Sequence, residues 1–371
     1  MGWIALVFGK FTSDFWVAEA YPFLSAFSNP HFPLALALIL LLLTFTEGRY
    51  SGLPNWLAGL LSFFLAIILP FCIVLTLVIL AGLLLWELYP NVRKLRQSIT
   101  FQRLAWIGMG GLPVLFYDFL VTYQDPLLRA WNSQNQTPSP PLWDLLVSLS
   151  PVFLLAVIGI WVNLKTQSRS MRLLISWMVL GFALLYIPWD LQRRFILGYF
   201  IPISALAAAG LAALVKRPKS YALAAILVVI LAIPTNLVIG LSTLHAINTH
   251  DARIYLSQGE ADALQWIAIN TPEEAVILAA PETGLLIPAY SGKRVLYGHP
   301  YETVDALRQK ERVMRLFNGK ASAVEASNLL GEADYLFIGP REAQLGNVAP
   351  LPYLELVYAK QGVRVFRIVH Q

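Results

Sequence analysis

Two adjacent arginines, Arg193 and Arg194, have the residue types and position best suited to chemistry, because they lie in a short polar turn between two long apolar runs. At about 1.5 Å rise per residue, runs 170–187 and 195–215 each approach the roughly 30 Å of a bilayer core. A guanidinium group is planar and matches a phosphate with two parallel hydrogen bonds. The pair would therefore anchor a cytoplasmic loop, bind an interfacial phosphate, or extend toward lipid headgroups.

Composition decides the class of protein. Of the 371 residues, 57% are hydrophobic and only 13% are charged, and the mean hydropathy is +0.61. These values predict a polytopic protein integral to the plasma (cytoplasmic) membrane. Residues 1–250 hold 15 of the 27 Lys and Arg but 8 of the 22 Asp and Glu, which indicates anchored loops and not nucleic-acid binding. The single cysteine, Cys72, excludes an internal disulfide and a Cys-rich metal site.

The apolar runs predict about eight transmembrane helices. Residues 53–88 are twice as long as one crossing requires, so we expect two helices meeting at Pro70, with one long kinked helix as the alternative. The other predicted crossings are 32–45, 104–123, 142–163, 170–187, 195–215 and 221–241. Eight crossings place the basic loops on one side, at Arg49, around Arg93, at Lys165 and at Lys216. The turn with the two arginines and everything after residue 250 are then extracytoplasmic.

Other polar residues are expected on the same outer face. They are His31, Asp118, Arg129, Asp144 and Asp190. Acidic residues at the ends of transmembrane helices usually face a cavity or pair with a cation, because lipid exposure costs several kcal/mol. Two interpretations remain open. In the first, Asp190 orients the arginines and His31 adds a contact to a bound lipid phosphate; in the second, the acids and arginines form a structural salt-bridge cluster.

Residues 251–371 have the character of a soluble domain. Predicted strands at 275–279, 294–297 and 334–338 alternate with helices at 261–270, 302–317 and 321–330, and a hairpin closes the chain around Gln361-Gly362. This alternation predicts a small α/β, Rossmann-like carboxy-terminal domain. No glycine-rich phosphate loop or nucleophile elbow stands at a strand-to-helix turn, so nucleotide binding and serine hydrolysis gain no support.

The segment 297–303 follows a predicted strand in this domain. Ligands collect at the carboxyl ends of strands in open α/β sheets, so His299 and Glu302 are candidates for acid–base or hydrogen-bonding roles. Alternatively, Glu302 and Thr303 cap the next helix and His299 satisfies a loop carbonyl.

The stretches 186–211 and 263–310 resemble bacterial GT-C-type multispanning membrane glycosyltransferases, the relatives of protein mannosyltransferases and aminoarabinose transferases (family 39-like). The Asn-Pro-His-Phe segment at His31 and the Ser139-Pro140 loop look similar to that group as well. The resemblance implies transfer of a sugar from a polyprenyl-phosphate donor at the outer membrane face, and by family analogy a divalent metal. The physical reading agrees on one point, since an arginine pair at the outer interface suits a lipid phosphate, so Arg193 and Arg194 would hold the donor phosphate.

Enzymes of this type carry an essential acid in the first outer loop, within an amino-terminal catalytic module. The expectation is that this module is lacking, because neither Asp14 nor Glu19 sits in a convincing equivalent. The acid would then come from Asp118, Asp144 or a protein partner that supplies the module. The leading hypothesis is a GT-C-like glycosyltransferase of the cell envelope, or its carboxy-terminal part. The alternative is a non-catalytic, membrane-anchored binding or assembly protein whose outer domain recognises a glycan or protein; a transporter is disfavoured because mid-membrane charges are scarce.

Overall fold

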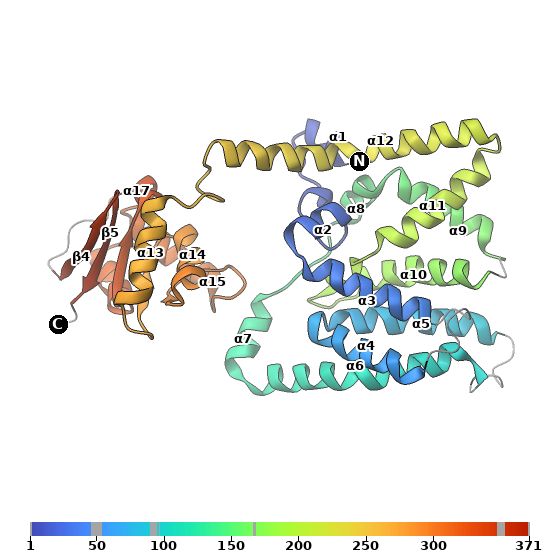
Figure 1. Ribbon diagram of the computed structural model, residues 1–371, viewed down its shortest axis with the longest axis horizontal. Helices are drawn as coiled ribbons and strands as arrows, with labels where there is room; N and C mark the ends of the chain where they lie inside the picture. Colours follow the sequence, from blue (N-terminus) through green and yellow to red (C-terminus); the bar gives the residue numbers. More distant parts are fainter. Residues whose placement is uncertain are drawn as a thin grey trace. The chain divides into compact units, whose positions relative to one another are not determined.

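The computed structural model describes residues 2–45, 54–89, 95, 97–165, 168–346 and 353–369. The chain divides into two compact units (Figure 1). The first comprises Met1–Tyr123 and Gln136–Ser242, and its described part is helical. The second comprises Gln124–Asn135 and Thr243–Gln371, and it contains the β-sheet.

Helices account for the regular structure described in the first unit. Their bounds are α1 Gly2–Val7, η1 Ser13–Phe15, α2 Pro22–Ser28, α3 His31–Phe45, α4 Asn55–Ile68, α5 Phe71–Leu88, α6 Ile99–Gln124, α8 Leu142–Leu149, α9 Val152–Asn163, α10 Arg169–Leu185, η4 Gln192–Ile196, α11 Phe200–Leu214 and α12 Pro218–Asn248. Each of the eight predicted crossings overlaps at least one of these helices.

Among the described residues, three helices are long and apolar enough to cross a membrane, namely α5, α6 and α12. The bent pair α8 and α9 would make a fourth. The helices α3, α4 and α11 are apolar but shorter. These features are consistent with a membrane protein, whereas the number of eight crossings stays a prediction. Of the predicted basic loops, Arg49 and Arg93 lie outside the described residues.

Two prolines interrupt the apolar runs. The prediction of two helices meeting at Pro70 is confirmed, because α4 ends at Ile68, α5 begins at Phe71, and the two helices contact each other. The expectation of one continuous helix over 142–163 is wrong. The chain bends by 89° between α8 and α9, where Pro151 supplies no N–H for a helical hydrogen bond and disfavours a helical conformation at Ser150.

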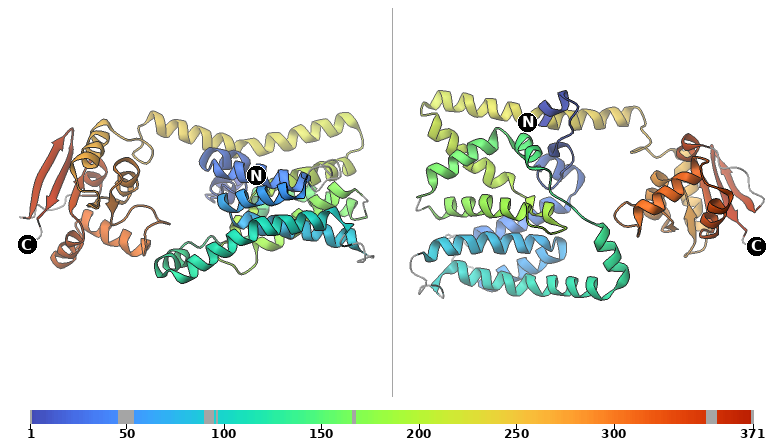
Figure 2. Two further views of the ribbon diagram at one scale, coloured as in Figure 1. Left: turned by 60° about the horizontal axis from the view of Figure 1, so that its bottom comes forward. Right: turned by 180° about the vertical axis from the view of Figure 1, so that it is seen from behind.

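Small residues allow the helices of this unit to pack closely. A Cβ atom on Gly110 of α6 would lie 2.0 Å from the carbonyl oxygen of Gly59 in α4, so these two backbones are in direct contact. Ser62 of α4 also donates a hydrogen bond of 2.7 Å to the carbonyl of Ile107. Both views in Figure 2 show α4, α5 and α6 side by side. Such contacts are typical of helix packing in membranes.

The second unit has a five-stranded mixed sheet in the order β2-β1-β3-β5-β4. Its elements are α7 Pro126–Gln134, α13 Gln258–Asn270, β1 Val276–Leu278, α14 Pro281–Ser291, β2 Arg294–Val295, α15 Ala306–Phe317, α16 Ala323–Gly331, β3 Tyr335–Ile338, α17 Pro340–Leu345, β4 Leu354–Lys360 and β5 Val363–Ile368. Strands β2, β1 and β3 are parallel, and β5 and β4 are antiparallel. The predicted hairpin around Gln361-Gly362 is confirmed.

Two hydrophobic cores cover opposite faces of this sheet. On one face, Ala263 and Ile267 of α13 and Ile287 of α14 pack with Ile277 of β1. On the other face, α15 and α16 pack with Leu278. Consecutive residues of a strand point to opposite faces, which explains why Ile277 and Leu278 belong to different cores.

Candidate functional site

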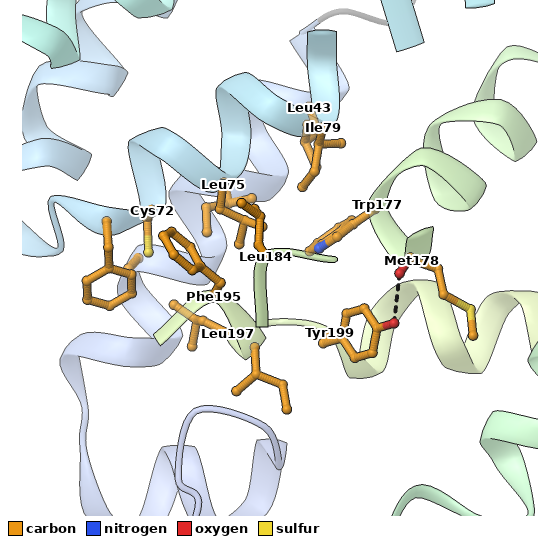
Figure 3. Close-up of a cluster of buried hydrophobic side chains, with 14 of the residues drawn as sticks. Leu43, Cys72, Leu75, Ile79, Trp177, Met178, Leu184, Phe195, Leu197 and Tyr199 are labelled. Carbon is orange, nitrogen blue, oxygen red and sulfur yellow. Dashed lines mark hydrogen bonds between the residues drawn. The ribbon is translucent and has the colours of Figure 1, made fainter. Parts of the chain in front are cut away.

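The chain that follows the two arginines is fixed in the core of the first unit. Phe195, Leu197 and Tyr199 are buried among side chains of α5 and α10 (Figure 3). The hydroxyl group of Tyr199 donates a hydrogen bond of 2.7 Å to the carbonyl of Met178. The apolar residues after Arg194 therefore hold the turn in place and leave the arginines at its edge.

The proline-rich loop before α8 binds the same turn. The amide of Thr137 donates to the carbonyl of Asp190 at 2.6 Å, and the amide of Arg193 donates to the carbonyl of Thr137 at 3.1 Å. Tyr186 donates to the carbonyl of Pro140 at 3.2 Å. Three hydrogen bonds thus hold the proline-rich loop against the segment 186–193, which contains the backbone of Arg193.

The two guanidinium groups lie against aromatic rings. Arg193 stacks over Trp16, with 5.4 Å to the ring centroid, and Arg194 lies over Phe71 at 5.8 Å. The Nε atom of Arg193 is 3.5 Å from a carboxylate oxygen of Glu19, whose side chain is 4% exposed. Within the described part of the chain, neither guanidinium group donates a hydrogen bond. Both retain donors for a ligand.

Glu19 belongs to a buried amino-terminal segment. Thr12, Ser13, Asp14, Phe15, Val17, Ala18, Glu19 and Ala20 are all buried. Asp14 accepts hydrogen bonds from the amide of Gly2 at 3.1 Å, from Thr12 at 2.8 Å and from Thr235 of α12 at 2.7 Å. Asp14 is thereby committed to holding this segment in the fold, and Glu19 is the acid left beside the arginines.

Asp144 has a similar anchoring role. Its carboxylate accepts from the amide of Ser13 at 2.7 Å and from Ser148 at 3.0 Å. The buried side chain of Asp144 forms no ion pair with Arg193 or Arg194. It ties α8 to the amino-terminal segment.

The other predicted outer residues lie elsewhere. Asp190 and His31 are exposed, and neither pairs with an arginine in the described residues. Asp118 is also exposed and lines an apolar groove of about 620 Å³ with Phe63 and Tyr117. The structure therefore brings Arg193 together with Glu19, a residue to which the sequence assigns no role. The available signal was the presence of two acids among the aromatic residues 11–21.

The loop with His299 and Glu302 is exposed on the second unit. His299 Nδ1 accepts a hydrogen bond from the amide of Tyr301 at 3.2 Å. The interpretation that Glu302 and Thr303 cap the next helix is wrong, because α15 begins at Ala306 with Asp305 at its N-cap position. A left-handed backbone at Asp305, with φ of 54°, delays the helix.

This loop is held by α7. Gln134 donates to the carbonyl of Thr303 at 2.6 Å and accepts from the amide of Asp305 at 3.0 Å, and Asn135 donates to the carbonyl of Tyr301 at 2.9 Å. The helix is capped by Asp125 at its start. The polar residues 124–135 therefore pack as part of the second unit.

No group of three or more His, Cys, Asp and Glu side chains that would hold a metal ion occurs among the residues placed by the structure. No protein-family model matches the sequence, and a search of the curated proteins finds no significant similarity. Function must therefore be argued from the arginines and Glu19.

Proposed function

We propose that this protein is a GT-C-like integral-membrane glycosyltransferase that uses a polyprenyl-phosphate-linked sugar at the outer membrane face. The observation that supports the proposal most is the buried Glu19 carboxylate 3.5 Å from Arg193, beside a second arginine with unused donors. Sugar transfer from a phosphate donor requires a general base for the acceptor hydroxyl and cations that stabilise the leaving phosphate. Glu19 and the two arginines would supply these groups.

The arginines would bind the donor phosphate. Arg193 and Arg194 keep their guanidinium groups beside apolar and aromatic surface, where a charged hydrogen bond is stronger than in bulk water. The fixed turn beneath them limits the reorganisation needed when charge develops on the phosphate. Polyprenyl chains lie in the membrane, so an arginine pair at the boundary suits their phosphate group.

Glu19 would act as the general base. A hydroxyl oxygen of the acceptor attacks the anomeric carbon of the donor sugar, and its proton passes to the Glu19 carboxylate. The bond between the anomeric carbon and the phosphate oxygen breaks, and the polyprenyl phosphate leaves as an anion held by Arg193 and Arg194. This scheme runs through these three side chains alone. Glu19 takes the place of the acid expected from Asp118, Asp144 or a partner protein.

The proposal includes the finer topology. Eight crossings would place the basic loops at Lys165 and Lys216 in the cytoplasm, and the arginine turn and the carboxy-terminal domain outside. The three parallel strands β2, β1 and β3, with helices on both faces, support a Rossmann-like description of that domain.

Arginine-to-lysine substitutions test the phosphate site. Arg193→Lys and Arg194→Lys keep the charge but remove the planar fork, so each should weaken binding of a polyprenyl phosphate by about tenfold, which is roughly 1.4 kcal/mol. Binding would be measured in detergent by microscale thermophoresis with the purified full chain. Arg217→Lys, in the exposed connection before α12, is the matched control and should bind like the unmodified protein.

Equal binding by all four proteins would overturn the phosphate site and favour the second candidate function. That candidate is a membrane-anchored binding protein, and a polar cleft in the second unit is the observation in its favour.

A further inference from the structure

The second unit has a crevice between β1 and β3 that the proposed transfer reaction does not use. These two strands are adjacent and parallel, and the helices that follow them lie on opposite faces of the sheet. Helix α14 follows β1 and packs with α13, whereas Leu345 of α17, which follows β3, packs with α15 and α16. In open α/β sheets this arrangement marks the point where ligands bind.

An internal carboxylate already occupies the anion-binding position of the crevice. Glu342 is 1% exposed and accepts hydrogen bonds from the amides of Ala280 at 2.9 Å and Gly339 at 2.8 Å, at the starts of α14 and α17. These are the amides that would otherwise bind a phosphate. Glu342 therefore occupies the place that a phosphate group would take at these two amides.

A cleft of about 350 Å³ is lined in part by Arg341, the chain neighbour of Glu342. It is lined by Asp251, Ala252, Arg253, Glu282, Arg341, Gln344 and Leu345. This volume is at the small end of ligand sites and suits a single small molecule. The residues come from α14, from α17 and from the segment after α12. The cleft therefore lies where the helices that follow the adjacent strands β1 and β3 diverge to opposite faces of the sheet, which is called the switch point.

The charges around the cleft are paired except for one. Arg341 is buried, pairs with Glu260, and donates to the carbonyls of Ala252 at 2.9 Å and Tyr255 at 2.7 Å. Asp251 and Arg253 pair with each other at 2.6 Å. Glu282 is exposed, and within the described residues it forms no ion pair or hydrogen bond. The lining thus offers an unpaired carboxylate together with the amide of Gln344.

We propose that this cleft binds a small primary amine that also carries hydroxyl groups, a ligand of amino-sugar size. The ammonium group binds Glu282, and the hydroxyl groups bind Gln344 and the oxygens of Asp251. This inference rests on the cleft alone and holds whether or not the protein transfers sugars.

Calorimetric titration of the full chain in detergent tests the site with glucosamine, glucose and glucuronate as probes. Glucosamine should bind more tightly than glucose, and glucuronate should not bind. Glu282→Gln should weaken glucosamine binding about tenfold, because it removes a charge-assisted hydrogen bond, and should change glucose binding by less than about threefold. Glu273→Gln is the matched control, since Glu273 is exposed at the opposite end of β1.

Gln344→Trp gives a second test, because the larger side chain fills the cleft from its exposed rim and should abolish binding of glucosamine and glucose. The melting temperature of each variant would show that it is folded. The inference is overturned if the unmodified protein does not bind glucosamine, if it prefers glucuronate, or if Glu282→Gln or Gln344→Trp leaves glucosamine binding unchanged. Loss of glucosamine binding in Arg193→Lys would assign the amine to the first unit instead.

Discussion

At the scale of single residues, Glu19 is the proposed general base of sugar transfer. It is buried, and its carboxylate lies 3.5 Å from the Nε atom of Arg193, which is too long for a strong hydrogen bond. A carboxylate in this setting keeps lone pairs for an incoming hydroxyl proton. Its ion pair also balances the charge of the arginine before a phosphate arrives.

Glu19→Gln should therefore lower sugar transfer by about 100-fold or more, within the range typical of a general base. Binding of polyprenyl phosphate should stay within about threefold, because the arginines are unchanged. Transfer from a radiolabelled lipid-linked sugar and binding of the lipid would be measured on the same preparation. Asp118→Asn serves as the comparison and should retain transfer; the opposite result, with Asp118 essential and Glu19 dispensable, would reassign the base.

The arginines could be found from sequence, whereas the position of Glu19 beside Arg193 could not. Two arginines between apolar runs stand out by type and spacing alone. Glu19 and Asp14 are isolated acids in a mixed segment, and their importance comes from contacts distant in sequence, such as that between Asp14 and Thr235. Long-range burial of this kind has no local periodicity to reveal it.

Glu342 gives the second unit a specific pH dependence. Burial raises the pKa of its carboxyl group above the ordinary value of 4.5, despite the two amides that donate to it. The folded state then binds more protons than the unfolded state. The contribution of the Glu342 carboxyl group to folding stability is complete below pH 4.5. It is lost as the pH rises through the higher pKa that this group has in the folded state.

The melting temperature of the second unit should accordingly fall as the pH rises above 4.5, and Glu342→Gln, which cannot titrate, should show a flatter profile over the same range. Thermal unfolding of the fragment 251–371, whose single tryptophan is Trp266, would measure both by fluorescence, since Trp266 packs against Tyr358 with 5.4 Å between ring centroids. Identical profiles for the two proteins would show that Glu342 is not the responsible group.

At the scale of elements, the close approach of α4 and α6 depends on glycine. Gly110→Ala should destabilise the first unit by about 1–3 kcal/mol, because the new methyl group would overlap the carbonyl of Gly59. Gly108→Ala on the same helix is the matched control. Its Cβ would meet only Leu112 at 3.5 Å, and alanine favours a helix.

Thermal unfolding of the full chain in detergent would compare these two variants. A drop in melting temperature for Gly110→Ala with none for Gly108→Ala is expected. Equal behaviour would mean that the α4 and α6 backbones are not in contact.

The two prolines Pro70 and Pro151 show when helix ends can be predicted from sequence and when they cannot. Pro70 lies in a run too long for one crossing, so length and proline together indicated two helices. Pro151 lies in a run of the right length for one crossing, and length alone concealed the bend between α8 and α9. The α7 helix was missed because residues 124–141 are rich in polar residues and proline, although Asp125 and Pro126 form a helix start.

At the scale of the whole molecule, the carboxy-terminal domain should fold by itself. Every buried residue of its two hydrophobic cores lies between residues 263 and 368. No buried core residue is therefore lost when the first unit is removed. Arg341 also keeps its partners Ala252, Tyr255 and Glu260 in a fragment that starts at residue 251.

The fragment 251–371 should be soluble and unfold cooperatively in urea, with coincident transitions in Trp266 fluorescence and circular dichroism. A fragment that aggregates, or whose two transitions differ, would show that the domain depends on the first unit or on α7.

Photocrosslinking with a polyprenyl phosphate that carries a diazirine on its first isoprene unit would show whether the lipid phosphate binds at Arg193 and Arg194. The full chain would be irradiated in lipid vesicles, digested and analysed by mass spectrometry. We expect label on peptides that contain Trp16 and Glu19 or Arg193 and Arg194, and a large loss of that label in the double variant Arg193→Lys, Arg194→Lys. Label confined to other helices, and unchanged in the double variant, would contradict this expectation.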